Sequence, residues 1–191
     1  MFHAKDIFDQ SIVDKQYIGE KLTKKRLSNC IFINCDFTES DFTDSNFLEC
    51  EFVNCNLSLV KLNNCSLQKV QFKNCKIVGV FFSNINPFLS KFHFCETVIN
   101  YCIFSDMDLS KTSFEGCIIQ DSQYENANLS GCNFSKTNLK NTIFKDANLT
   151  GANFRDATDY SINPNETILK KTVFSHPEVL SLLDYLDIII D

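Results

Sequence analysis

The chain has 191 residues, which is enough for a single domain, and it carries a formal net charge of −6. A nucleic-acid partner held by a basic surface is therefore not expected. No apolar run approaches the roughly 20 residues of a membrane-spanning helix, and the opening MFHAKDIFDQ lacks the basic and then apolar order of a signal peptide, so we expect a cytoplasmic protein.

The first segment, residues 1–21, is polar and irregular and is interpreted as an N-terminal cap. A five-residue repeat of large apolar residues can be traced from Leu22, but Glu20 and Lys25 stand where the repeat elsewhere has a small residue. In a fold built from stacked repeats, the first repeat exposes unpaired backbone, and charged side chains there block edge-to-edge aggregation. The basic run 24–26 is therefore interpreted as part of a solvated edge coil and not as a nucleic-acid patch.

The stretch from Leu27 to Phe154 is organised by this repeat. Every fifth residue is large and apolar, and the residue two positions before it is mostly small, as at Cys35 before Phe37. A period of five fits neither a helix, at 3.6, nor a strand, at 2. It fits a chain that turns a corner every five residues and points two side chains inward, so that four corners close a coil of 20 residues.

Residues one coil apart should then stack in columns, and the sequence meets this demand. The columns agree if two extra residues lie between Phe82 and Leu89, so we expect a small bulge or loop at 83–88. The four columns are Phe32, Phe52, Phe72, Phe94, Phe114, Phe134, Phe154; Phe37, Leu57, Ile77, Ile99, Ile119, Leu139; Phe42, Leu62, Phe82, Phe104, Tyr124, Phe144; and Phe47, Leu67, Leu89, Leu109, Leu129, Leu149.

The corners of the coils are marked by small or polar residues. All five glycines lie two residues after a position of the repeat, where the chain turns and glycine costs least. Asn34, Asn54 and Asn74 occupy the same corner on successive coils, so a ladder of side-chain amides is expected there. Pairing of neighbouring coils at about 4.8 Å gives a rod roughly 30 Å long for about six coils.

The repeat resembles that of the pentapeptide-repeat family, whose units read small residue, Asp or Asn, Leu or Phe, and two polar residues. ANLSG at 127–131 and ANLTG at 147–151 match this pattern fully, and CDFTE and SDFTD at 35–44 match four positions each. The resemblance covers about two-thirds of the chain. It implies an all-β fold, a right-handed quadrilateral β-helix, spanning residues 22–159.

The ten cysteines could be taken for a disulfide framework. Nine of them, however, occupy the small inward position, where a free thiol acts as a small hydrophobe. Stacked pairs such as Cys35 and Cys55 would hold their Cβ vectors parallel, which is poor geometry for a disulfide. We therefore expect ten free thiols. Cys95 is the exception in position, since it is expected to face outward beside His93.

The outward positions of two early coils are acidic, and no Lys or Arg occurs between Arg26 and Lys61. These acids form the predicted partner-binding wall. A simpler interpretation, which the sequence leaves open, is that Asp is merely a favoured residue of the repeat. The acids are Asp36, Glu39, Asp41, Asp44, Glu49 and Glu51.

The last segment, residues 160–191, is predicted to cap the open end of the rod. Ser175 and Glu178 form a capping-box signature before a short helix, and a short strand is expected at 188–190. The segment either only caps one molecule or also builds a twofold dimer, which we expect because relatives in the family dimerise end to end. The predicted dimer residues are Val179, Leu180, Leu182, Leu183, Leu186 and Ile188.

No catalytic constellation is found in the sequence. The histidines His3, His93 and His176 lie far apart, and no phosphate-binding loop or paired-carboxylate pocket can be placed. The bore is filled by Phe and Leu and offers no cleft. We therefore expect a binding protein and not an enzyme, without a cofactor or a metal site.

The closing segment and the interrupted repeat resemble the Qnr-type quinolone-resistance and microcin-immunity branch of the family. That resemblance implies a duplex-DNA mimic that binds a type II topoisomerase and protects it from quinolones or a toxin, without itself binding nucleic acid. The short interruption departs from the long loops of Qnr-type proteins. Two alternatives stay open: an interaction scaffold with another partner, and a metal or redox sensor using Cys95 and His93.

Overall fold

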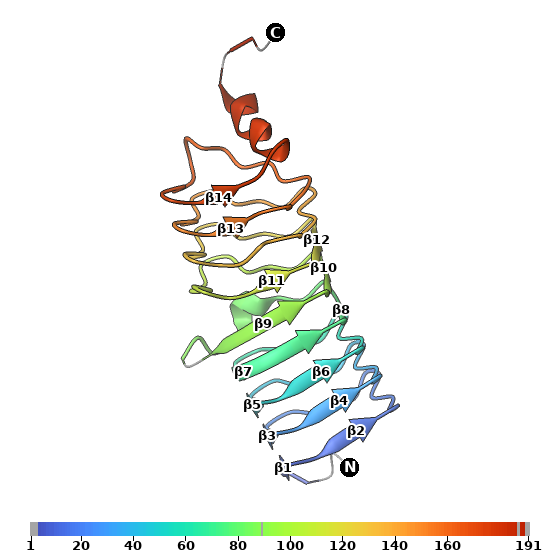
Figure 1. The fold of residues 1–191 in the computed structure, drawn as a ribbon. Helices are drawn as coiled ribbons and strands as arrows, with labels where there is room; N and C mark the ends of the chain where they lie inside the picture. The colour runs from blue at the N-terminus through green and yellow to red at the C-terminus, as the bar shows by residue number, and fades with distance from the viewer. Residues whose placement is uncertain (1–3, 89, 187, 190–191) are drawn as a thin grey trace.

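The chain winds into a single all-β solenoid of about eight turns, in which successive coils stack along one axis (Figure 1). The computed structural model describes residues 4–88, 90–186 and 188–189. This confirms the predicted β-helix. The number of turns is larger than the six expected, because the stack begins earlier and ends later than the repeat pattern indicates.

The strands are short, as expected for a chain that turns every five residues. They are β1 (Asp6–Phe8), β2 (Ser11–Val13), β3 (Arg26–Ser28), β4 (Ile31–Ile33), β5 (Asn46–Leu48), β6 (Glu51–Val53), β7 (Ser66–Lys73), β8 (Lys76–Val78), β9 (Lys91–Cys95), β10 (Val98–Asn100), β11 (Phe114–Glu115), β12 (Ile118–Gln120), β13 (Asn153–Phe154) and β14 (Val173–Phe174). Two 3₁₀-helices are described, η1 (Phe82–Asn84) and η2 (Glu178–Tyr185).

The strand pairs of the described chain are parallel and join residues about one coil apart. Phe32 is in register with Phe52, and Phe52 with Phe72, 20 residues on in each case. The largest sheet has the order β1-β3-β5-β7-β6-β4-β2, with β9 and β11 joined to it through β7. Strand β7 turns through a corner, since its first half pairs with β5 and its second half with β6. Strands β12-β10-β8 and β13-β14 form the two smaller sheets.

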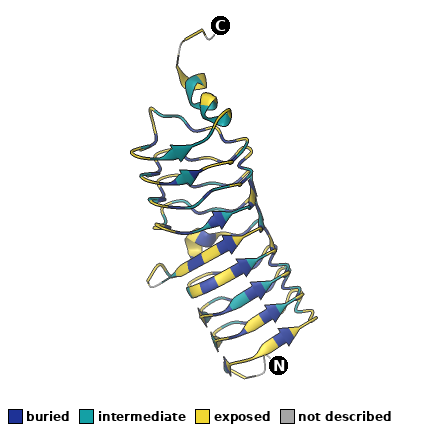
Figure 2. Ribbon diagram, in the orientation of Figure 1, coloured by how far each residue is buried: buried dark blue, intermediate teal, exposed yellow. Residues whose placement is uncertain are grey.

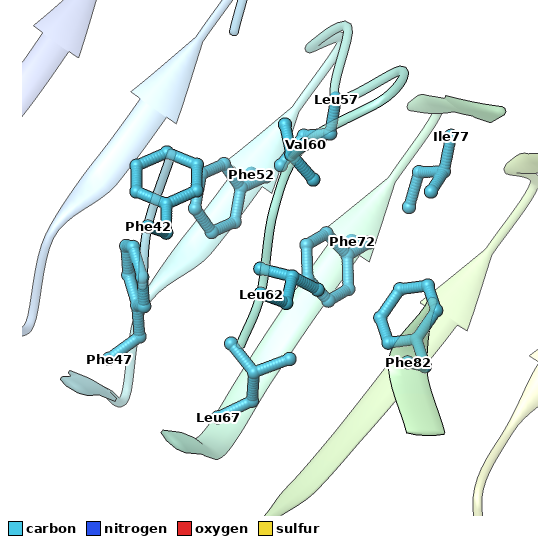
Figure 3. A pocket seen from close by; sticks show the side chains of 10 residues that line it. All are labelled: Phe42, Phe47, Phe52, Leu57, Val60, Leu62, Leu67, Phe72, Ile77 and Phe82. Atoms are coloured by element: carbon cyan, nitrogen blue, oxygen red, sulfur yellow. The ribbon is translucent and has the colours of Figure 1, made fainter. Parts of the chain in front are cut away.

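The bore is filled by the predicted aromatic and aliphatic columns, and Figure 2 shows buried residues alternating with exposed ones along each coil. The rings of Phe52 and Phe72 stack at 5.2 Å, and those of Phe114 and Phe134 at 4.9 Å. Near Phe72 and Phe82 the inward side chains leave a cavity of only about 10 Å³ (Figure 3), which is at most the space of a single water molecule. This part of the bore therefore has no room for a ligand.

The cysteines fill the small inward positions as expected. Nine are buried, Cys95 is exposed, and all ten thiols are free. Seven of the nine buried thiols bond to backbone carbonyls of the preceding coil; for example, Cys55 Sγ donates to the Phe32 carbonyl at 3.4 Å. These residues therefore act as compact spacers at the corners of the bore.

We predict that only one thiol, that of Cys95, reacts promptly with a thiol reagent under native conditions, because burial excludes both solvent and reagent from the other nine. In denaturant without reductant, all ten should react. Titration with a chromogenic disulfide reagent measures both numbers. The Cys95→Ser variant is the control and should lose the prompt signal; two or more prompt thiols in the native protein would contradict the burial.

The stack begins before residue 22, which differs from the predicted polar cap. Ile7 and Ile12 are buried, and β1 and β2 pair with β3 and β4. The five-residue spacing continues back to Ile7. Polar residues such as Lys15 are tolerated at the inward small positions here, because this coil lies at the end of the bore.

The interruption of the repeat lies slightly later than predicted. Residues 82–84 form η1, Ile85 is buried, and the chain leaves the coil over 86–88, before β9 (Figure 1). The register of the pairing between β7 and β9 shifts between Gln68 and Val70. Phe92 is buried where other coils have a small residue, so this coil holds one more large ring than its neighbours. Leu89, which was expected in the fourth column, lies outside the described residues.

The C-terminal end also departs from the prediction. The last coil continues to Phe174, whose ring stacks on Phe154 at 5.3 Å. The predicted capping box is wrong: no side chain caps η2, and the Ser175 hydroxyl accepts the Asp156 N–H instead. Ile188 and Ile189 are not in a strand, and Ile190 lies outside the described residues.

Candidate partner-binding surface

The bore is packed with side chains, so a partner can contact this part of the molecule only through the outer walls. Among the described residues, no three His, Cys, Asp or Glu side chains converge as a metal site would require. His93 and Cys95 both lie on β9, but the His93 Nδ1 already accepts the Ser113 N–H at 3.0 Å. Burial lowers the pKa of His93. The described part of the chain also contains no helix able to span a bilayer.

The six acids of the predicted wall are distributed around the rod and do not share one wall. The acids on strands or ladders between coils are Asp36, Asp41 and Glu51. The acids at corners, all with positive φ, are Glu39, Asp44 and Glu49. Because the chain turns a corner every five residues, acids that are close in sequence point in different directions.

Several of these acids are paired with lysines. Glu51 forms a salt bridge of 2.6 Å with Lys73, and Glu49 pairs with Lys69 of the next coil. Asp41 lies between Lys21 and Lys61 in its ladder. The pKa of Asp41 is lowered on balance. Burial alone would raise this pKa, but the hydrogen bonds from Thr43 and the charges of the two lysines outweigh burial. The local field is therefore weaker than the sequence suggests.

A second set of acids lies along one corner of the rod and was not singled out from the sequence. Asp44, Asp106 and Asp146 share this corner, and we call them the acidic edge. Asn64 donates to Asp44 at 2.8 Å, and Asn126 donates to Asp106 at 2.7 Å, so amides fill intervening rungs. The sequence does contain a signal for this set. The three acids are separated by whole coils of 20 residues, once the two inserted residues are subtracted.

A second corner of the rod also has amide side chains that donate to the residue one coil earlier. Asn54 donates to Asn34 at 3.3 Å, and Asn34 donates to Asp14 at 2.9 Å, as the predicted amide ladder requires. Amide donors thus leave the corner carboxylates of Asp14, Asp44 and Asp106 hydrogen-bonded but still exposed, which suits a surface that presents negative charge.

The predicted dimer residues are divided between packing and exposure. Leu182 packs against the core, and Val179 and Leu183 are half-buried. The remaining side chains face solvent. The exposed members are Leu180, Leu186 and Ile188. The segment therefore covers the last coil and still leaves apolar surface exposed at the end of the rod.

Comparison with known families gives matches over most of the coil. The family model described as pentapeptide repeat region matches residues 25–98, and the model described as pentapeptide repeats (8 copies) matches residues 125–158. Together these matches cover more than half of the chain. No curated protein matches the sequence significantly.

Among solved structures, the chain is similar to three forms of QnrB1, each described as a plasmid-mediated fluoroquinolone resistance protein. One trypsin-treated variant has a TM-score of 0.75 at 19% identity and covers 97% of this chain and 99% of that chain. A second trypsin-treated variant has a TM-score of 0.63 at 18% identity, covering 97% and 100%. The full-length form has a TM-score of 0.52 at 17% identity, covering 94% and 100%.

Proposed function

Because the chain belongs to the pentapeptide-repeat family, we propose that it is a non-catalytic binding protein that imitates duplex DNA. Its partner would be a type II topoisomerase, DNA gyrase or topoisomerase IV, which it protects from quinolones or a gyrase-poisoning toxin. The observation that carries the proposal is the match in shape over nearly the whole rod to a fluoroquinolone resistance protein.

The distribution of charge supports mimicry better than a single acidic wall would. Phosphates wind around a duplex, and they follow one another about every 1.7 Å along its axis when both strands are counted. Carboxylates on several walls and along the acidic edge likewise surround a rod. With about eight turns at about 4.8 Å, the rod is roughly 38 Å long. Electrostatic attraction would guide such a rod onto the positively charged DNA-binding surface of a topoisomerase.

We further propose that two copies join through the C-terminal segment, which doubles the length of the DNA-like surface. Leu180, Leu186 and Ile188 supply the apolar contact. A twofold axis would bring the same residues of both copies together.

The Leu180→Asp variant should form smaller assemblies than the wild-type chain, because it places a charge in the centre of the C-terminal apolar contact. Light scattering after size-exclusion chromatography measures the mass. The Ile18→Asp variant, which changes an exposed residue at the opposite end, is the control. A mass of Leu180→Asp equal to that of the wild-type chain at the same concentration would show that the segment only caps the rod.

The proposed function is tested by adding the purified protein to gyrase, supercoiled plasmid and a fluoroquinolone. We expect less trapped cleaved DNA as the protein concentration rises. Replacing Asp44, Asp106 and Asp146 by asparagine should weaken binding to gyrase about tenfold or more, because several exposed charges are lost. Asparagine already occupies this corner on other coils, so the fold should tolerate the change.

The matched control replaces Glu49 and Glu51 by glutamine. Both carboxylates are already paired with lysines, so their loss should change binding much less. No effect of the wild-type protein on cleavage or supercoiling at any dose would exclude topoisomerases as partners. The remaining proposal would then be an interaction scaffold, which the pairing of Glu49 and Glu51 with lysines favours because it weakens the DNA-like field.

A further inference from the structure

One wall of the rod and the corner beside it carry an exposed apolar patch halfway along the rod. Phe81 and Tyr101 are 52% and 62% exposed, and Leu59 is 50% exposed. Phe81 pairs in register with the half-buried Ile103 of the next coil. The Leu59 side chain lies over Gly79, since a Cβ on that glycine would come within 2.8 Å of Leu59 Cδ2.

These side chains lie over or beside one continuous inward column. We call the surface the Phe82 wall, because its inward column includes Phe82, which stacks on Phe104 at 4.6 Å. Phe104 stacks on Tyr124 at 4.8 Å. The wall is therefore rigid, and its apolar surface is not needed to fill the core. A contiguous exposed apolar patch on a rigid wall indicates a binding surface.

The charges of the Phe82 wall lie on both sides of the apolar patch, and their signs are ordered. On the earlier coils, Asp41 and Lys61 stand one residue before the inward column and pair in register with each other. On the later coils, Glu125 and Lys145 stand one residue after the column. Measured from the midpoint between Phe81 and Ile103, coils at equal distances therefore carry opposite signs.

This order matches a second copy of the same wall. A twofold axis that crosses the rod at the midpoint places each coil of one copy opposite the coil at the same distance on the other side. Phe81 then faces Ile103 at the centre. Tyr101 faces the Leu59 side chain that covers Gly79. Phe81 and Ile103 therefore meet at the centre of the contact, and Tyr101 and Leu59, which lie at a corner of the coil, meet beside them at one border.

The charged groups meet diagonally around this centre. The coil of Lys61 faces the coil of Glu125, and the coil of Asp41 faces that of Lys145. The members of each pair are offset by two residues along the coil, or about 7 Å, which long side chains can span as they do between diagonal neighbours in a sheet. Opposite charges thus surround an apolar centre, which favours this pairing over a parallel one.

We propose that two copies of this protein associate side by side and antiparallel through the Phe82 wall. The acidic edges of the two copies come near one another at the border of the contact, where solvent and salt screen their repulsion. This lateral contact is separate from the C-terminal contact and does not depend on a topoisomerase partner.

Sedimentation equilibrium of the full chain over a range of concentrations tests the proposal. The Leu180→Asp background removes any C-terminal contact. In that background we expect a reversible dimer. Phe81→Ser should weaken it about tenfold or more, since a central aromatic anchor is lost. Ile18→Ser, which changes an exposed residue of the first coil, should leave it unchanged.

The charge order provides a sharper test. Lys61→Glu and Glu125→Lys should each weaken the dimer about tenfold, because each places like charges near one another twice in a twofold contact. With both changes in one chain, the pairs are merely exchanged and the affinity should return to within about threefold of the starting value. Both positions are exposed, and far-ultraviolet circular dichroism verifies the fold.

Two results would overturn the proposal. One is a purely monomeric Leu180→Asp protein at every concentration. The other is a double charge variant that stays as weak as the single variants. A purely monomeric protein would mean that the Phe82 wall binds another protein. A weak double charge variant would mean that two copies associate in a different way.

Discussion

Replacing Phe114 with alanine should lower the free energy of unfolding by about 3–5 kcal/mol. The Phe114 ring is fully buried and stacks on Phe94 at 5.3 Å and on Phe134 at 4.9 Å. Its loss opens a cavity in the middle of the longest aromatic column. The neighbouring coils cannot collapse into this cavity, because their backbones are fixed by hydrogen bonds between coils on all four walls.

Urea unfolding followed by circular dichroism measures this loss. The control is Phe8→Ala, which changes an aromatic ring that is 52% exposed and should shift stability by no more than about 0.5 kcal/mol. Since each coil contacts only its neighbours, the Phe114 variant should also broaden the transition as the two halves of the stack unfold separately. Equal effects of the two substitutions would contradict the column as the main source of stability.

Raising the pH from 9 toward 12 should unfold the protein. Burial raises the thiol pKa to about 12 at five positions, compared with an ordinary value of 9.0. These residues are Cys50, Cys65, Cys102, Cys117 and Cys132.

The number of protons bound by the folded and unfolded chains decides whether stability rises or falls with pH. Between pH 9 and 12 the folded chain keeps protons on these thiols that the unfolded chain releases, so stability is complete below pH 9 and falls as the pH rises. Each thiol contributes a loss of about 1.4 kcal/mol per pH unit, or about 7 kcal/mol per unit together. Because domains are stable by only about 5–15 kcal/mol, unfolding is expected near pH 11. Burial also raises the pKa of Tyr124, which adds to the loss above pH 10.

The slope is measured from urea midpoints between pH 8 and 11. Alanine occupies the inward small position in several coils, so Cys117→Ala is a conservative variant. It should reduce the slope by about 1.4 kcal/mol per pH unit. Stability that is constant across this range would mean that the thiols ionise without unfolding the coil.

The sequence was sufficient for the fold because the same physical constraint recurs at every coil. A column such as Phe52, Phe72 and Phe94 can be recognised without knowing any neighbour's position. The ends of the stack were harder to place. The buried residues Tyr160 and Ile162 do not keep the five-residue spacing, so the repeat pattern predicts a cap where the structure has the last coil.

The candidate surface was less predictable than the fold. Neighbours in sequence, such as Asp36 and Asp41, suggest one acidic cluster, but each step of five residues carries the chain to another wall. Neighbours on the surface are separated by whole coils, as Asp106 and Asp146 are across two coils. Side-chain pairing, such as that of Glu51 with Lys73, depends on rotamers that the repeat pattern does not fix.

The coil of 20 residues also sets the rules by which such a chain can change length in evolution. Inserting or deleting one whole lap moves everything downstream by about 4.8 Å along the axis and keeps each side chain facing the same direction. Inserting five residues instead turns the downstream half by a quarter revolution. The interior would accept that change, because the large and small positions still alternate, but Phe81 and Ile103 would no longer be neighbours if the insertion fell between them.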